Sequence, residues 1–162
     1  MAGYVDKVLL EDEEIVHRAA VHWVVYLGGI VWVGLAIIVF IASSSYGARL
    51  AVNVGGAPYH PLTWVGYVML VLGAFRLMGA ALEQWTTELA ITTRRAIAKV
   101  GFIRRETWEI NASKIESVEV DQSIFGRLLG YGTVVVKGTG GGTTPMKLIA
   151  DPIAFRNHIT AR

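Results

Sequence analysis

Residues 23–42 read WVVYLGGIVWVGLAIIVFIA, and this stretch decides how the chain is organised. It contains 20 residues and no charged side chain. At about 1.5 Å per residue, a helix of this length covers roughly 30 Å, which is the thickness of the hydrocarbon core of a bilayer. We therefore predict a transmembrane helix here. A cleaved signal peptide is the alternative, but its apolar core would be shorter and the segment before it basic rather than acidic.

A second apolar stretch, LTWVGYVMLVLGAFRLMGAAL, follows at residues 62–82. Pro58 and Pro61 precede it and prevent a helix from running through the connecting loop. Residues 19–82 contain only two charged side chains, Arg49 and Arg76, although 17% of the 162 residues are charged and the mean hydropathy is +0.47. We predict a two-helix transmembrane hairpin at 19–82, which excludes a fully soluble enzyme and a disordered chain.

The basic residues predict how the hairpin is oriented. The loop at 43–61 contains only Arg49, whereas five bases follow the second span: Arg94, Arg95, Lys99, Arg104 and Arg105. Because Lys and Arg near a span resist translocation, both termini are expected on the cytoplasmic side of the cell membrane. Residues 1–18 would then be a cytoplasmic N-terminal segment, and the chain would be a multi-pass protein with two spans.

Arg76 interrupts the second span and has two interpretations. It is a candidate intramembrane polar site, since ionisable residues inside a bilayer often mark a substrate or ion path. Alternatively, its long side chain reaches the interface, because Arg76 is only six residues, or roughly 9 Å of helix, from Leu82. We favour the second interpretation.

Beyond Gln84 the pattern changes to short segments rich in Val, Ile, Thr and Trp that are separated by turn residues. We predict strands at residues 85–93, 96–100, 102–110, 115–121, 133–138 and 145–150. Gly101 suits a tight turn between the second and third of these strands.

Helical signals in this region are confined to two places. Asp151 is a candidate N-cap and Pro152 suits the first turn of a C-terminal helix, on which Phe155 and Ile159 would face the sheet. A short helical turn is predicted around IFGRLL, residues 124–129, with its apolar side chains plugging the open end of the sheet.

Four pieces of the sequence resemble the bacterial pleckstrin-homology (PH) domain family of small membrane proteins. They are TTRR at residues 92–95, IESVEV at 115–120, RLLGYGTV at 127–134 and the DP pair at 151–152. In that family two transmembrane helices commonly precede a cytoplasmic PH-like domain. The resemblance implies a membrane α-helical hairpin plus a β-rich PH-like domain at 83–162, built as a bent antiparallel sheet with a C-terminal capping helix. It also implies a recognition or assembly module.

No catalytic, metal or cofactor site is predicted. His17, His22, His60 and His158 are scattered along the chain, the chain has no cysteine, and no nucleophile elbow occurs. The glycine run at 138–142 lacks the Gly-Lys-Ser/Thr of a phosphate-binding loop. We expect a protein that is not an enzyme and uses no cofactor.

The basic cluster, defined as Arg94, Arg95, Lys99, Arg104 and Arg105, has two interpretations. These residues are candidates for contact with anionic lipid at the membrane surface, where each base adds about 1 kcal/mol. The simpler interpretation is that they only set the topology and lie on the solvated face of a hairpin. Nucleic acid is not expected as a partner, since neither interleaved aromatic residues nor a groove-reading helix accompanies the cluster.

The acidic run Glu11, Asp12, Glu13 and Glu14 lies on the same predicted side of the membrane. It could pair with the basic cluster and tie the N-terminus to the β-rich domain. We favour a solvated charge run, because exposed ion pairs contribute little to stability.

Together these patterns predict a non-enzymatic integral membrane protein whose PH-like domain serves as an assembly, scaffold or adaptor module. Its expected partners are the lipid bilayer and either further copies of the chain, giving a homo-oligomer, or another membrane protein. Two alternatives remain: an oligomeric channel or transport accessory protein, and an anionic-lipid-sensing membrane module.

Overall fold

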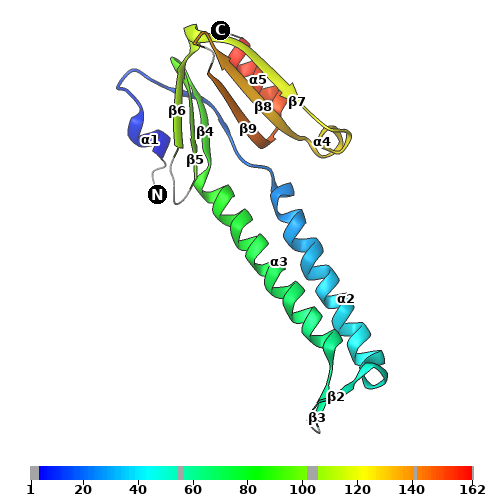
Figure 1. The fold of residues 1–162 in the computed structure, drawn as a ribbon. Coiled ribbons are helices and arrows are strands. Elements are labelled where there is room, and N and C mark those ends of the chain that lie inside the picture. The colour runs from blue at the N-terminus through cyan, green and yellow to red at the C-terminus, as the bar shows by residue number, and fades with distance from the viewer. Residues whose placement is uncertain (1–3, 55–56, 102–105, 141, 162) are drawn as a thin grey trace. The chain divides into compact units, whose positions relative to one another are not determined.

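The computed structural model describes residues 4–54, 57–101, 106–140 and 142–161, and the chain forms two compact units (Figure 1). The first unit joins Met1–Val25 to Leu82–Arg162, and the second is Tyr26–Ala81. The N-terminal segment therefore belongs to the same unit as the β-rich region, although we expected residues 1–18 to be a separate region. The second unit is an insertion between the two parts of the first.

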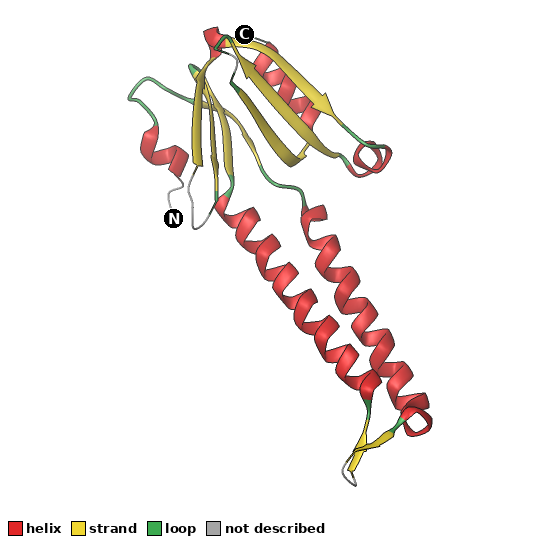
Figure 2. Cartoon of the chain, viewed as in Figure 1, coloured by secondary structure: helices red, strands yellow, loops and turns green. Residues whose placement is uncertain are grey.

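Two long helices dominate the second unit (Figure 2). The elements from the start of the hairpin to its end are the 3-10 turn η1 Trp23–Tyr26, α2 Leu27–Leu50, β2 Val52–Val54, β3 Ala57–Tyr59 and α3 Pro61–Thr86. By length and composition, both helices are able to cross a membrane. Two apolar helices joined by a short connection were predicted, but at different bounds.

Both helices differ in extent from the prediction. The first continues to Leu50 because serine does not break a helix, and Ser44 Oγ donates to Ile41 O at 2.8 Å within the helix. The second continues to Thr86, where Thr86 Oγ1 donates to Leu82 O at 2.6 Å and stabilises the last turn. Trp85 is therefore helical, and the predicted strand at 85–93 begins only at Glu88.

Glycine allows α2 and α3 to pack closely against each other. A Cβ atom placed on Gly29 would lie 2.6 Å from the Leu77 side chain, and one on Gly73 would lie 2.8 Å from Val33. Near the other end of the pair, Ser43 Oγ lies 2.6 Å from Thr63 Oγ1. Small residues at a helix interface and polar pairs across it are typical of helices packed in a bilayer.

The first sheet lies in the first unit and is antiparallel, with the order β1-β4-β5-β6. Its strands are β1 Ile15–Ala19, β4 Glu88–Thr92, β5 Arg95–Val100 and β6 Glu106–Asn111. The register pairs Ala19 with Leu89, so the strand that precedes the helical hairpin lies directly beside the strand that follows it. In topology, the hairpin is a long insertion between two hydrogen-bonded strands.

A second antiparallel sheet has the order β7-β8-β9. It follows the 3-10 turn η2 Ala112–Lys114 and consists of β7 Ile115–Asp121, β8 Tyr131–Gly138 and β9 Thr143–Ala150. Just beyond β1, Val21 pairs with Ile149 of β9, and His22 N donates to Leu148 O at 2.7 Å. The segment from Ile15 to His22 thus pairs with β4 through its first part and with β9 through its last part, and it joins the two sheets.

The main core lies between the two sheets and the C-terminal helix α5 Pro152–Thr160. Phe155 and Ile159 are 1% and 8% exposed, which confirms the predicted inward face of α5. Asp151 occupies the predicted N-cap position and Pro152 the first turn, but Asp151 has φ 48° and its side chain makes no capping hydrogen bond. Its backbone turns the chain from β9 into the helix instead.

The short helix α1 Tyr4–Val8 contributes to a smaller core around Val5, Ala90 and Ile97. Consequently, four of the five residues of β4 and three of the six residues of β5 are buried. A strand that is covered on both faces loses the alternation of apolar and polar residues.

The helix α4 Ile124–Leu129 forms where a helical turn was predicted, but its side chains do not plug the sheet. Ile124, Phe125 and Leu128 are 82%, 69% and 80% exposed. Ser123 caps the helix by accepting the N–H of Gly126, and Gly130 ends it with φ 76°. The Ser123 cap and the Gly130 turn fix only the backbone of α4. They therefore stabilise the helix even though its apolar side chains are exposed.

Candidate functional site

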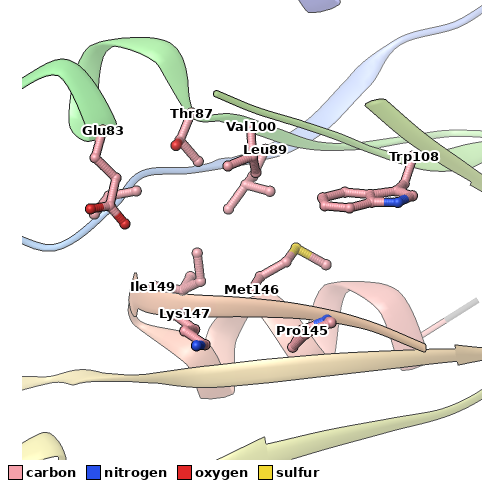
Figure 3. Close-up of a pocket in the computed structure, with 10 residues that line it drawn as sticks. Glu83, Thr87, Leu89, Val100, Trp108, Pro145, Met146, Lys147 and Ile149 are labelled. Atoms are coloured by element: carbon pink, nitrogen blue, oxygen red, sulfur yellow. The ribbon is translucent and has the colours of Figure 1, made fainter. Parts of the chain in front are cut away.

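A cavity of about 140 Å³ opens between the two sheets of the first unit (Figure 3). One wall comes from β4, β5 and β6, and the opposite wall from β9 (Figure 3). The lining residues are Val21, Glu83, Thr87, Leu89, Val100, Trp108, Pro145, Met146, Lys147 and Ile149. The cavity is therefore a part of the space between the sheets that the core side chains leave unfilled.

Most of the cavity wall is apolar. Leu89, Met146 and Ile149 also belong to the main core and are at most 6% exposed, so packing fixes their positions. The indole of Trp108 packs against the same core, and Figure 3 shows it on the wall opposite Met146. A rigid apolar wall suits a hydrocarbon or aromatic group, which gains free energy by leaving water.

Three polar side chains line the rest of the cavity. Glu83 and Lys147 are exposed and mark its solvent side, while the hydroxyl oxygen of Thr87 is buried. Within the part of the chain that the structure describes, Thr87 Oγ1 has no hydrogen-bond partner. A buried hydroxyl without a partner costs about 1–3 kcal/mol, so a group that hydrogen-bonds to it would find a favourable position.

The geometry supports binding rather than catalysis. The cavity is lined by one carboxylate, one ammonium group and one hydroxyl, with neither histidine nor cysteine among the lining residues. Over the described ranges, no group of three His, Cys, Asp or Glu side chains is placed to hold a metal ion. The cavity can hold an apolar group that also carries one polar atom, and the Thr87 hydroxyl can donate a hydrogen bond to that atom or accept one from it.

The three described members of the basic cluster, Arg94, Arg95 and Lys99, pair with different acids. Arg95 Nε donates to Glu13 Oε1 at 3.0 Å, and Arg95 Nη2 donates to Glu13 Oε2 at 2.8 Å. The same guanidinium donates to Glu109 at 2.6 Å and to the carbonyl of Val8 at 2.8 Å. With 15% of its side chain exposed, Arg95 connects the N-terminal segment, β5 and β6. Its contact with lipid stays a prediction.

The other members of the cluster lie in different surroundings. Lys99 forms an ion pair with Glu88 at 3.2 Å, and Arg94 forms a long, exposed pair with Asp12 at 3.7 Å. Arg104 and Arg105 lie outside the described residues. Arg76 is exposed on α3 and is not part of the cavity.

Glu13 is the residue that sequence reasoning misjudged most clearly. Its side chain is fully buried, although the acidic run was expected to be solvated. The hydrogen bonds from Arg95, together with that from the Thr92 hydroxyl, lower the pKa of Glu13 to about 2 in spite of burial. The neighbouring acids are exposed, so only a partner more than 70 positions away distinguishes Glu13 from them.

Sequence reasoning also missed the cavity. Its lining residues come from five separate segments, and no local motif links them. The sequence IVHRA at residues 15–19 also gave no clear signal for β1, because apolar Val16 is on the exposed face and His17 on the less exposed one.

A comparison with protein families agrees with this architecture. The family described as Bacterial PH domain matches residues 20–162, which include both long helices, the cavity and α5. No curated protein and no solved structure matches the chain. The family match confirms the resemblance carried by the segments at 92–95, 115–120, 127–134 and 151–152. This chain belongs to the bacterial PH domain family.

Proposed function

We propose that this protein spans a membrane twice and that its PH domain is a non-catalytic docking module for another protein. The cavity between the sheets carries this proposal, because a fixed apolar wall beside a buried, unpaired hydroxyl fits an apolar group with one polar atom. An apolar side chain flanked by peptide groups has this chemistry. The occupant would thus be an apolar segment of a partner protein or of a second copy of this chain.

The surface of the helical hairpin supports the membrane part of the proposal. In the most apolar window of each helix, only 11% and 17% of the residues are buried. Ile38 and Ile41 of α2 and Phe75 of α3 are more than 60% exposed. The core helix of a soluble protein would bury such side chains, whereas a bilayer accommodates them.

The topology of the first unit explains how membrane anchoring and docking would be combined. β1 and β4 are hydrogen-bonded neighbours, so the chain leaves the domain for α2 and returns from α3 at adjacent positions in one sheet. Val21, Glu83 and Thr87, which lie next to these connections in the sequence, also line the cavity. A partner bound there would be held close to the attachment points of the hairpin.

Photo-crosslinking in cells tests the docking proposal. A photoactivatable amino acid at Pro145, which lines the cavity, should form an adduct with one defined protein, whereas the same group at exposed Glu116 on β7 should not. A Val100→Phe substitution in the Pro145 variant should fill the cavity and reduce the adduct several-fold. Equal adducts from both positions, or no effect of Val100→Phe in a protein with unchanged melting temperature, would contradict the proposal.

Cysteine labelling tests the membrane part separately, because the natural chain contains no cysteine. Ser45→Cys, at the far end of α2, should react with a membrane-impermeant maleimide in intact bacteria. Thr160→Cys, on α5, should react only after the cells are permeabilised. Equal labelling of the two variants in intact cells would show that the hairpin does not span the membrane.

A further inference from the structure

Among the described residues of the first unit, the apolar face of α4 groups three of the most exposed hydrophobic side chains. Ile124, Phe125 and Leu128 lie on this six-residue helix, and each of them is more than two-thirds exposed. Arg127, also exposed, is the charged residue within the helix. We call Ile124, Phe125 and Leu128 the α4 tip.

The fold holds the α4 tip in place. Gln122 Nε2 donates to Tyr131 O at 3.0 Å, which links the two ends of the loop that contains α4. A Cβ atom on Gly126 would lie 2.6 Å from the same carbonyl oxygen, so α4 packs against the following strand through this glycine. The exposed apolar side chains therefore stand on a backbone that is fixed by short contacts and by the caps at Ser123 and Gly130.

Contacts within the first unit place the α4 tip near His22, which directly precedes Trp23 at the end of the N-terminal part of this unit. The ring of His22 lies 5.5 Å from the ring of Tyr131, measured between centroids. Tyr131 is two residues from the end of α4, a separation of at most about 7 Å along the chain. His22 directly precedes the turn that leads into α2, and its neighbour Trp23 is 49% exposed.

We propose that the α4 tip inserts into the interfacial region of the bilayer that the hairpin spans. This inference rests on the proposed membrane anchoring. Exposed Trp residues stand beside both connections to the hairpin, Trp23 before α2 and Trp85 near the end of α3, and tryptophan is enriched at membrane interfaces. If two spans anchor the domain to the bilayer, the effective concentration of lipid at the α4 tip is high. Three apolar side chains are then enough for contact with lipid.

The composition of the tip favours lipid over a protein partner. Its three side chains carry no polar atom, so placing them in hydrocarbon leaves no side-chain hydrogen-bonding group without a partner. Arg127 stands beside them and matches the phosphate groups of lipid heads. One Phe and two branched aliphatic residues beside one basic residue are typical of a shallow interfacial anchor. Such an anchor buries its apolar face about 5–10 Å into the boundary between lipid headgroups and acyl chains.

Site-directed fluorescence in proteoliposomes tests this inference. Single cysteines at Leu128, at Arg156 on α5 and at Ile38 on α2 would be labelled with an environment-sensitive dye in the full-length protein. The vesicles would contain phosphatidylcholine and phosphatidylglycerol, with or without a quencher on the lipid chains. We expect blue-shifted emission and at least two-fold lipid quenching at Leu128→Cys and Ile38→Cys, but neither effect at the exposed control Arg156→Cys.

A second substitution tests the tip itself. Phe125→Asp in the Leu128→Cys protein should abolish lipid quenching at position 128 and leave the melting temperature unchanged, since Phe125 is not part of the core. If position 128 is quenched by aqueous iodide and not by lipid, the tip faces water and the inference is wrong. If it is protected from both quenchers, a protein covers the tip, and the inference is equally wrong. Loss of lipid quenching at Ile38→Cys would instead refute the membrane proposal.

Discussion

The helical hairpin and the β domain are specified by the sequence in different ways. The hairpin consists of continuous apolar stretches, and its contacts lie between two helices that follow each other along the chain. The β domain is assembled from Met1–Val25 and Leu82–Arg162, and the ion pair between Glu13 and Arg95 connects its two parts. Composition is therefore enough to recognise the hairpin, while the domain depends on pairings across the whole insertion.

The largest effect is expected from breaking the connection between the two parts of the domain. Arg95→Met would leave the carboxylate of Glu13 buried without its cation, and breaking a buried ion pair in this way costs about 3–5 kcal/mol. Arg94→Met is the matched control, since its pair with Asp12 is exposed and is worth less than about 1 kcal/mol. Thermal unfolding of the full-length protein in detergent should separate the two variants clearly. Equal melting temperatures would show that the Glu13 contact does not stabilise the domain.

The same contact predicts a dependence of stability on acid. The pKa of Glu13 is lowered from 4.5 to about 2 in the folded protein, mainly by its hydrogen bonds with Arg95. Its contribution to stability is thus fully present above the unfolded pKa and is lost as the pH falls from about 4.5 towards 2. The melting temperature of the domain should fall over this range, and Glu13→Gln should flatten the slope. Glu14→Gln, at an exposed position, should keep the slope of the natural protein.

In the hairpin, a smaller effect is expected and should stay local. Gly73→Val would place Cβ 2.8 Å from Val33, whereas a Cβ on Gly79 of the same helix meets nothing within 4 Å. Overpacking of this kind costs about 1–3 kcal/mol. Disulfide formation between Ser43→Cys and Thr63→Cys, whose hydroxyl groups lie 2.6 Å apart, reports on helix contact. Gly73→Val should slow it and Gly79→Val should not; equal rates would contradict the observed packing.

The smallest effect is expected where β1 meets α5. The rings of His17 and His158 are stacked at 4.5 Å, and the ring of Phe155 lies 6.3 Å from His17. Burial, and then the proximity of His158, lower the pKa of His17, an effect that Asp151 partly offsets. Because the folded state binds fewer protons at His17, stability should decline as the pH falls through about 6.5.

His17→Phe should reduce the slope of melting temperature against pH around 6.5, whereas His60→Phe in the hairpin unit should leave the slope intact. We expect only a modest difference in slope between the two variants, because His17 is partly exposed. An unchanged slope in His17→Phe would mean that the protonation of His17 does not differ between the folded and unfolded states.

Sequence patterns predicted the elements that local physics determines. All six predicted strands have a counterpart in the structure: the strand at 115–121 has the predicted bounds and the others have shifted ends, while residues 102–105 of the predicted strand at 102–110 lie outside the described residues. The inward face of α5 was also predicted correctly, and Gly101 has the positive φ, 100°, that suits a turn. The strand start at Trp85 was wrong, because an aromatic residue with high strand propensity can equally end an apolar helix.

The features that were missed all depend on distant partners. Nothing in the acidic run distinguishes Glu13 from Glu14 until β4 and β5 are in place beside it. The α4 tip was expected to be buried because its residues are apolar, yet the main core is packed by Phe155 and Ile159 of α5 and includes no residue of the tip. Site prediction failed for the same reason, since the cavity exists only after two sheets are joined through Val21 and Ile149.

The position of the hairpin between β1 and β4 imposes an order on biosynthesis. The residues of β1 leave the ribosome before either helix, but their partners in β4 are made only after the whole hairpin. The first sheet therefore cannot close during translation until both helices have been synthesised. A translating chain that has not completed its hairpin therefore leaves β1 without β4, its partner in the finished sheet.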